Sequence, residues 1–205
     1  MLVSDITRKV QRLFGDSSAF IVIDQNDIYD WINEAMLLIA RKTHCLTIVV
    51  SNQANAYPLT IPTDWIITKR VTYDLPEIPL KYMDIEDLDA YSINPLEVDV
   101  PEFYYIFNGK INLYPNPGGV KSIKHYYARV PNNVSTTNAT PELPISFHED
   151  LVRFCLMRAH ERNQDKSNVE ISASIFQSTD GLRQEEANIG DDDYYVVRDD
   201  PGEAE

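Results

Sequence analysis

Apolar residues recur at helical spacing near both ends of the chain and at strand spacing between them. A first helix is predicted over residues 4–14, with Ser4 as its N-cap. Toward the other end, a helix of about 18 residues is predicted, with one apolar face formed by Phe147, Leu151, Phe154, Cys155 and Ala159. A weaker helix is predicted after it, from about Asn168 to Ala187, with Ile171, Ile175 and Leu182 aligned.

The stretch DIYDWINEAMLLIARKTHCL, Asp27 to Leu46, predicts the longest helix, with Asp24 as a suitable N-cap. Its apolar stripe is wide, because residues on both sides extend the central positions Ile28, Ile32, Ala35 and Ile39. Leu37 lies on the opposite face, near Arg41. Two interpretations remain open: Leu37 is a partly covered surface residue, or it contacts a second subunit.

Between the helices, about 95 residues show the alternation and turns of β structure. Strands are predicted at Leu46–Val50, at Ile66–Tyr73 and at Ser122–Val130. In the second of these, Thr68, Arg70 and Thr72 are expected on one face, and Lys69 interrupts the alternation, which favours an edge position. Asn108-Gly109 between two β-rich runs predicts a type I′ hairpin of Phe103–Phe107 with Lys110–Tyr114.

The predicted fold is α+β: a mainly α-helical bundle interrupted by an inserted antiparallel β module, with an extended C-terminal tail. The helical bundle is assigned to residues 1–50 and 142–190, the β module to residues 51–141, and the tail to residues 191–205. Helices this far apart in sequence can pack together, because the two ends of an inserted unit can lie close to one another. Arg158 and Arg162 fall inside the apolar arc of the third helix, where their guanidinium groups are expected to reach carboxylates or water.

Charge is distributed unevenly along the chain. The net charge is −14, and residues 185–205 contain nine acidic residues and one basic residue, Arg198. Such a tail repels nucleic-acid phosphates, so a site that grips DNA through its backbone is not expected. The two cysteines, Cys45 and Cys155, are predicted to be buried and reduced, and the N-terminus lacks the apolar run of a signal peptide. A cytoplasm-like compartment is therefore expected.

Candidate chemistry is sparse. His148 and Cys155 could share a helical face, and the acidic loop from Asp84 to Glu102 could attract a divalent cation, but neither has a recognised ligand spacing. Residues 121–127 mix lysine with tyrosine, which fits either a half-buried strand or a base-stacking strand. The phosphate-binding and nucleophile-elbow motifs GxGxxG, GxxxxGK and GxSxG do not occur. No catalytic, cofactor-binding or metal-binding residue is therefore predicted, and the chain is not expected to be an enzyme.

The ordered set formed by the Asp27–Leu46 stretch, YPLTIPTDW, RVTYD, PEFYYIFNGKINLYPNP and ELPISFHEDLVRFCLMRAHERNQD resembles the head-to-tail adaptor (connector) proteins of tailed bacteriophages. The resemblance covers most of residues 1–165. It implies a structural virion protein of the neck, assembled in the host cytoplasm as a ring, commonly of twelve copies, under the portal. It also implies a second partner below, such as a stopper, terminator or tail hub, and passage of DNA through the lumen during genome packaging and ejection.

The resemblance suggests two groups of contact residues. On the long helix, Tyr29, Leu37 and Arg41 would face a neighbouring subunit, and in the tail the apolar anchors on the portal would be Tyr194, Tyr195, Val196 and Val197. The competing interpretation of the tail is a solubilising segment. For the whole chain, the alternatives are a monomeric acidic interaction module and a metal-dependent enzyme using His148, Cys155 and the acidic loop.

Overall fold

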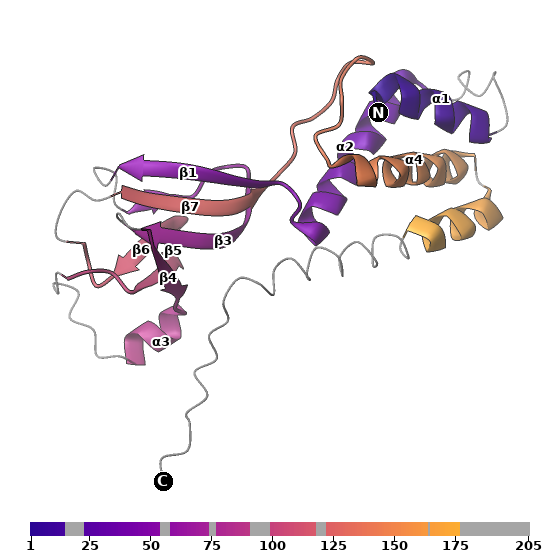
Figure 1. The fold of residues 1–205 in the computed structure, drawn as a ribbon. Coiled ribbons are helices and arrows are strands. Elements are labelled where there is room, and N and C mark those ends of the chain that lie inside the picture. Colours follow the sequence, from indigo (N-terminus) through magenta and orange to yellow (C-terminus); the bar gives the residue numbers. More distant parts are fainter. Residues whose placement is uncertain are drawn as a thin grey trace, which may run out of the picture. The chain divides into compact units, whose positions relative to one another are not determined.

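The computed structural model describes residues 1–14, 23–53, 58–73, 77–90, 99–117, 122–163 and 165–176. Its contacts divide the chain into two compact units. The helical unit consists of Met1–Cys45 and the described residues from Pro131 onward, and the β unit is Leu46–Val130 (Figure 1). The chain is therefore α+β, with the β structure inserted between helices, as predicted.

Helix α1, Val3–Phe14, packs on helix α4, His148–Arg162, as Figure 1 shows. Its buried residues include Val3, Ile6 and Val10. Lys9 of α1 forms an ion pair with Glu149 in the first turn of α4. Burial of the periodic apolar face is the main source of stability for such a helix, because an isolated helix of this length is marginal in water.

Helix α2, Gln25–Thr43, also packs on α4. Asp24 is its N-cap, and the Asp24 backbone N–H donates a hydrogen bond to Asp27 Oδ2 at 2.9 Å, which forms a capping box. The helix ends before the predicted Leu46, because His44 adopts a left-handed conformation with φ 50°. The predicted stripe is buried, and the buried residues of α2 are Ile28, Ile32, Ala35, Met36, Ile39, Ala40 and Thr43.

Helix α4 follows a short 3₁₀ turn, Ile145–Phe147, and its predicted apolar face is confirmed. Phe147, Leu151, Phe154, Cys155 and Ala159 are all buried. A further helix covers residues 166–176, and the predicted continuation to Ala187 lies outside the described residues. Its anchor is Phe176, which is buried with its ring 5.3 Å from that of Phe154, whereas Ile171 and Ile175 are exposed. The aligned Ile171 and Ile175 therefore lie on the exposed side of this helix, and Leu182 lies outside the described residues.

Residues 131–144 contact the helices of the helical unit through backbone hydrogen bonds. The Val3 N–H donates to the Ala139 carbonyl, and the Ser4 N–H donates to the Thr137 carbonyl, both at 2.9 Å. The contacts thus place residues 131–141 with the helices and residues 46–50 with the sheet. The sequence pattern had placed residues 131–141 in the β module and residues 46–50 in the helical bundle. A polar loop without periodicity, such as residues 131–141, gives no indication of what it packs against.

The β unit contains one seven-stranded sheet in the order β1-β7-β3-β4-β5-β6-β2. The strands are β1 (Thr47–Gln53), β2 (Leu59–Thr60), β3 (Trp65–Tyr73), β4 (Ile78–Tyr82), β5 (Phe103–Phe107), β6 (Lys110–Tyr114) and β7 (Ser122–Arg129). The sheet is mixed, because β4 and β5 are parallel while the other pairs are antiparallel. A short helix, α3 (Ile85–Ala90), follows β4.

The predicted hairpin is confirmed. Strands β5 and β6 pair in register from Phe103 with Tyr114 to Phe107 with Lys110. Asn108 and Gly109 have φ values of 50° and 68°, which is the pair of left-handed residues that a type I′ turn requires. The hairpin contributes Tyr104, Ile111 and Leu113 to the core of the sheet.

Strand β3 corrects the prediction of an edge position, because it lies between β7 and β4. Its register with β7 shifts between Trp65 and Ile67 and again between Thr68 and Arg70. The second shift moves Arg70 opposite Tyr126 although Thr68 is opposite Tyr127, so Thr68 and Arg70 face opposite sides of the sheet. Lys69 interrupts the alternation because it is the extra residue of a bulge.

Candidate functional site

The predicted subunit-contact residues lie along one row of α2. Tyr29, Leu37 and Arg41 are spaced by multiples of four residues, with Asn33 between the first two, so all four lie along one side of the helix. Tyr29 and Leu37 are half-buried within the chain, and Arg41 is exposed. The structure therefore brings these residues together on a single ridge, of which only the Arg41 end is open.

Asn33 in the middle of this row is bound by the same chain. Its side-chain amide donates to the Val134 carbonyl at 3.1 Å, and its side-chain oxygen accepts from the Val134 N–H at 2.8 Å. Val134 itself is buried. Besides α4, helix α2 therefore contacts the segment 131–144 of the same chain. The helical pattern of α2 could not reveal this contact.

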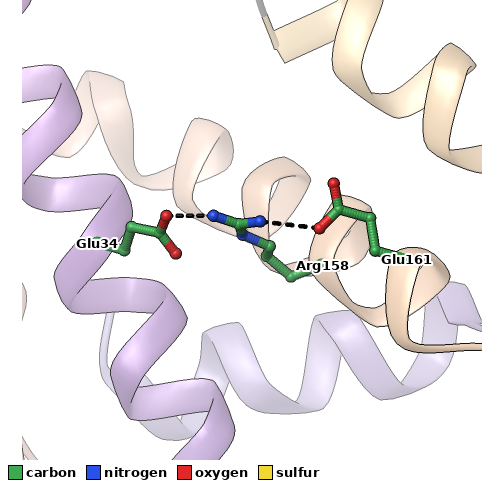
Figure 2. A network of polar contacts seen from close by, with 3 residues as sticks. All are labelled: Glu34, Arg158 and Glu161. Atoms are coloured by element: carbon green, nitrogen blue, oxygen red, sulfur yellow. Dashed lines mark hydrogen bonds and ion pairs between the residues drawn. The ribbon is translucent and has the colours of Figure 1, made fainter.

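The other flank of α2 is joined to α4 by ion pairs. Figure 2 shows Arg158 of α4 between Glu34 of α2 and Glu161, with its Nη1 2.9 Å from Glu161 Oε2. The guanidinium also lies 5.2 Å from the ring centroid of Phe154. Arg162 pairs with Asp27 in the first turn of α2. These contacts confirm that the guanidinium groups of both arginines reach carboxylates, although Arg162 is exposed.

The edge position of strand β1, which overlaps the predicted strand Leu46–Val50, is the feature that the sequence-based prediction missed. Among the described residues, β1 pairs with β7 only, so its other side is an open sheet edge. Ile48 and Val49 are exposed, although consecutive strand residues point to opposite faces. The sequence does contain an indication: residues 43–63 include no Asp, Glu, Lys or Arg, in a chain that is 24% charged.

On β7, the lysine and tyrosine side chains of the candidate base-stacking strand are bound within the β unit. Lys124 forms an ion pair with Glu77, and the Tyr126 hydroxyl donates to Glu77 Oε2 at 3.1 Å. The Arg70 guanidinium lies 5.8 Å from the Tyr126 ring. Hydrogen bonds from Lys124 and Tyr126 lower the pKa of Glu77, so the carboxylate stays charged. This arrangement supports the half-buried strand rather than a surface prepared for nucleic acid.

His125 on the same strand is buried beside Thr68 and Tyr127. Its Nε2 lies 2.9 Å from Thr68 Oγ1, which accepts a hydrogen bond from Trp65 Nε1 at 3.1 Å, and its ring stacks on Tyr127. Burial lowers the pKa of His125 to about 4, so the imidazole is neutral at physiological pH. His125 is thus a structural part of the sheet.

A scan against known protein families matches residues 1–198 to the SU10 adaptor protein family. The chain belongs to this family. No curated protein matches the chain. The match confirms the resemblance to bacteriophage adaptor proteins that the ordered sequence motifs indicated, and it identifies the chain as a structural phage protein.

For this adaptor, the metal-enzyme alternative has no geometric support in the described residues. These contain no group of three His, Cys, Asp or Glu side chains close enough to bind a metal ion. His148 is buried with Nε2 2.9 Å from the Leu143 carbonyl, and burial raises the pKa of the Cys155 thiol. A thiol with a raised pKa is a poor ligand and a poor nucleophile.

Two further observations concern the surface of the adaptor. In the described part of the chain, no helix is both long enough and apolar enough to cross a bilayer. The predicted portal anchors Tyr194, Tyr195, Val196 and Val197 lie outside the described residues, as do residues 91–98 of the loop between Asp84 and Glu102.

Proposed function

We propose that this chain is a head-to-tail adaptor that forms a ring of about twelve copies under the portal in the virion neck. The ring joins the portal to the next neck or tail component, a stopper, terminator or tail hub, after the copies have been made in the host cytoplasm. The observation that carries this proposal is the family match over residues 1–198. The α+β architecture with an inserted β unit agrees with the fold predicted from the sequence.

One subunit contact is proposed along the α2 row. The exposed Arg41 and the adjacent, half-buried Leu37 would contact the neighbouring copy, with Tyr29 at the far end of the row. Because Asn33 is already bonded to Val134, the contact uses the Arg41 end of the row. Replacing Arg41 with Glu should weaken ring formation, whereas the same change at the exposed Arg8 of α1 should leave it intact. Equal ring formation by both variants would contradict this contact.

The tail is the second proposed contact. Tyr194, Tyr195, Val196 and Val197 provide apolar anchors, and the acidic residues that flank them would meet basic residues of the portal. Removing residues 191–205 should abolish portal binding while the rest of the chain keeps its circular dichroism spectrum. Unchanged portal binding by the shortened chain would identify the tail as a solubilising segment.

DNA would pass through the ring without specific binding. The chain carries a net charge of −14, and a lumen of this sign repels phosphates and lets the duplex slide. A fluorescence anisotropy titration with a labelled duplex at low salt, where electrostatic binding is strongest, should show no saturable binding. Tight binding under these conditions would overturn this part of the proposal.

The decisive experiment mixes the purified full chain with the assembled portal protein encoded by the same phage genome. Electron microscopy and mass measurement should show one ring of copies added to one end of each portal. A chain that is monomeric alone is compatible with the proposal, because the portal can template the ring. A chain that stays monomeric beside the assembled portal would overturn it and would fit the acidic interaction module.

A further inference from the structure

The direction of the backbone groups of β1 follows from one hydrogen bond. The Arg129 N–H donates to the Leu46 carbonyl at 2.9 Å, so these two residues form a hydrogen-bonded pair at the start of the β1–β7 ladder. Such pairs alternate along antiparallel strands, so Ile48 and Val50 also bond toward β7. The N–H and C=O groups of Val49 and of its neighbours two positions away, Thr47 and Ser51, therefore point outward from the edge of the sheet.

This edge lacks the usual protection against strand addition. Sheet edges are normally blocked by charged side chains, proline or short length. Strand β1 is seven residues long and contains neither charge nor proline. Ile48 is 38% exposed and Val49 is 46% exposed, on opposite faces of the sheet. An added strand would thus find outward hydrogen-bonding groups and apolar side chains on both of its faces.

The charge distribution indicates what the added strand belongs to. Two copies of a chain with net charge −14 repel one another, so self-association is favoured where the contact brings no acidic residues together. Residues 43–63 are the stretch around β1 without charged residues. We propose that β1 pairs with a strand edge of a second copy of this chain, so that the sheet continues from one subunit to the next.

This inference rests on the proposed function and adds the surface through which the copies associate. In a closed ring, an edge of one copy meets a different surface of the next copy, which gives the head-to-tail contact that cyclic symmetry needs. Backbone pairing would supply affinity, and Ile48 and Val49 would hold the register of the added strand.

The test substitutes Val49 in the full chain and measures filling of the portal by mass photometry over a range of adaptor concentrations. Val49→Pro removes one outward N–H and leaves the bonds to β7 in place, since proline is tolerated where a strand N–H faces solvent. Val49→Lys is the second variant, and it adds a charge at the edge without restricting the backbone. Each variant is checked for folding by circular dichroism and by the fluorescence of Trp65.

The matched control is Ile78→Lys. Ile78 is 42% exposed, like Val49, but it lies on β4, which pairs with β3 and β5. Both Val49 variants should need at least roughly tenfold more protein for half-filling and should leave partly filled rings. Val49→Pro loses a backbone hydrogen bond at each interface, and Val49→Lys replaces an apolar contact there with a charge. The Ile78 variant should fill the portal like the unmodified chain.

Each other outcome overturns a defined part of the argument. If the unmodified chain fills the portal and both Val49 variants do so equally well, or if Ile78→Lys is as defective as they are, the β1 contact is overturned and the ring stands. If the Val49 variants form complete rings but lose the next neck component, the strand belongs to that protein and not to a second copy. If the unmodified chain does not bind the portal, the proposed function fails together with this inference.

Discussion

In the helical unit, ion pairs join helices that are far apart in the sequence, whereas the β unit leaves an uncharged strand at its edge. Lys9–Glu149, Asp27–Arg162 and Glu34–Arg158 connect α1 and α2 to α4. In the β unit, by contrast, polar groups bond mainly between neighbouring strands, as in the pair of Thr68 with His125. The outward groups of β1 have no such partner strand among the described residues.

The difference separates contacts that hold the chain's own helices together from the surface that the proposed assembly would use. The helical unit uses its charged side chains to join α1 and α2 to α4, and Asn33, in the α2 row that had been expected to face a neighbour, is bonded to Val134. The β unit keeps a backbone edge free of the charge that would repel another acidic copy. Self-assembly is therefore expected to depend more on β1 than on the charged face of α2.

The largest expected effect tests whether the helical unit and the β unit unfold independently. Replacing the fully buried Leu151 of α4 with Ala should destabilise the helical unit by about 3 kcal/mol, through lost burial and an unfilled cavity. Each unit contains one tryptophan, Trp31 in α2 and Trp65 in β3, so urea unfolding can be followed separately in Trp→Phe backgrounds. The Trp31 transition should shift and the Trp65 transition should not. Equal shifts of the two transitions would show that the helical unit and the β unit unfold as a single cooperative unit.

The next effect distinguishes the β unit by its response to pH. Burial lowers the pKa of His125 to about 4 from its ordinary value of 6.5, so protonation favours the unfolded state. The contribution of His125 to the free energy of unfolding is complete above about pH 6.5 and is lost as the pH falls toward 4. At pH 4.5 this loss is about 2 kcal/mol. Urea unfolding followed by Trp65 at pH 7.5 and 4.5 measures this loss. His125→Phe should respond less to pH, and an equal response would exclude His125 as the source.

A smaller effect tests the intrachain partner of α2. Asn33→Ala should destabilise the helical unit by about 1–2 kcal/mol, because it leaves both backbone groups of Val134 without their partner. The loss is expected although alanine is the better helix former. Asn33→Asp, which keeps only the acceptor, should give an intermediate loss in the same Trp31 assay. A neutral Asn33→Ala variant would show that segment 131–144 does not stabilise α2.

The smallest effect concerns the ion pairs. Arg158→Ala should cost about 1 kcal/mol, because it removes two carboxylate contacts and the packing on Phe154. Arg8→Ala, which removes a single exposed pair with Asp5, should cost less than about 0.5 kcal/mol. The two variants are compared by thermal unfolding at low and high salt, and equal losses would mean that the bridge to α2 adds nothing.

The sequence-based prediction succeeded where the information was local. The stripe of α2, the apolar face of α4 and the Asn108-Gly109 turn follow from spacing and from backbone preference within a few residues. It failed at Lys69, where an interrupted alternation indicated an edge and the cause was a bulge in a strand inside the sheet. It also assigned no role to Phe176, which is buried in the last described helix with its ring against that of Phe154.

The sequence by itself determined the helices with their buried faces, the hairpin, the α+β class and, through ordered motifs, the adaptor family. Each of these depends on periodicity, on turn residues or on order along the chain, which a single sequence records. Only the tertiary structure decided that Val134 occupies the second face of α2, that β3 is internal and that β1, among the described strands, pairs with β7 alone. Those features depend on which distant segments pair, and strand order and loop packing are set by the free energy of contacts across the whole fold.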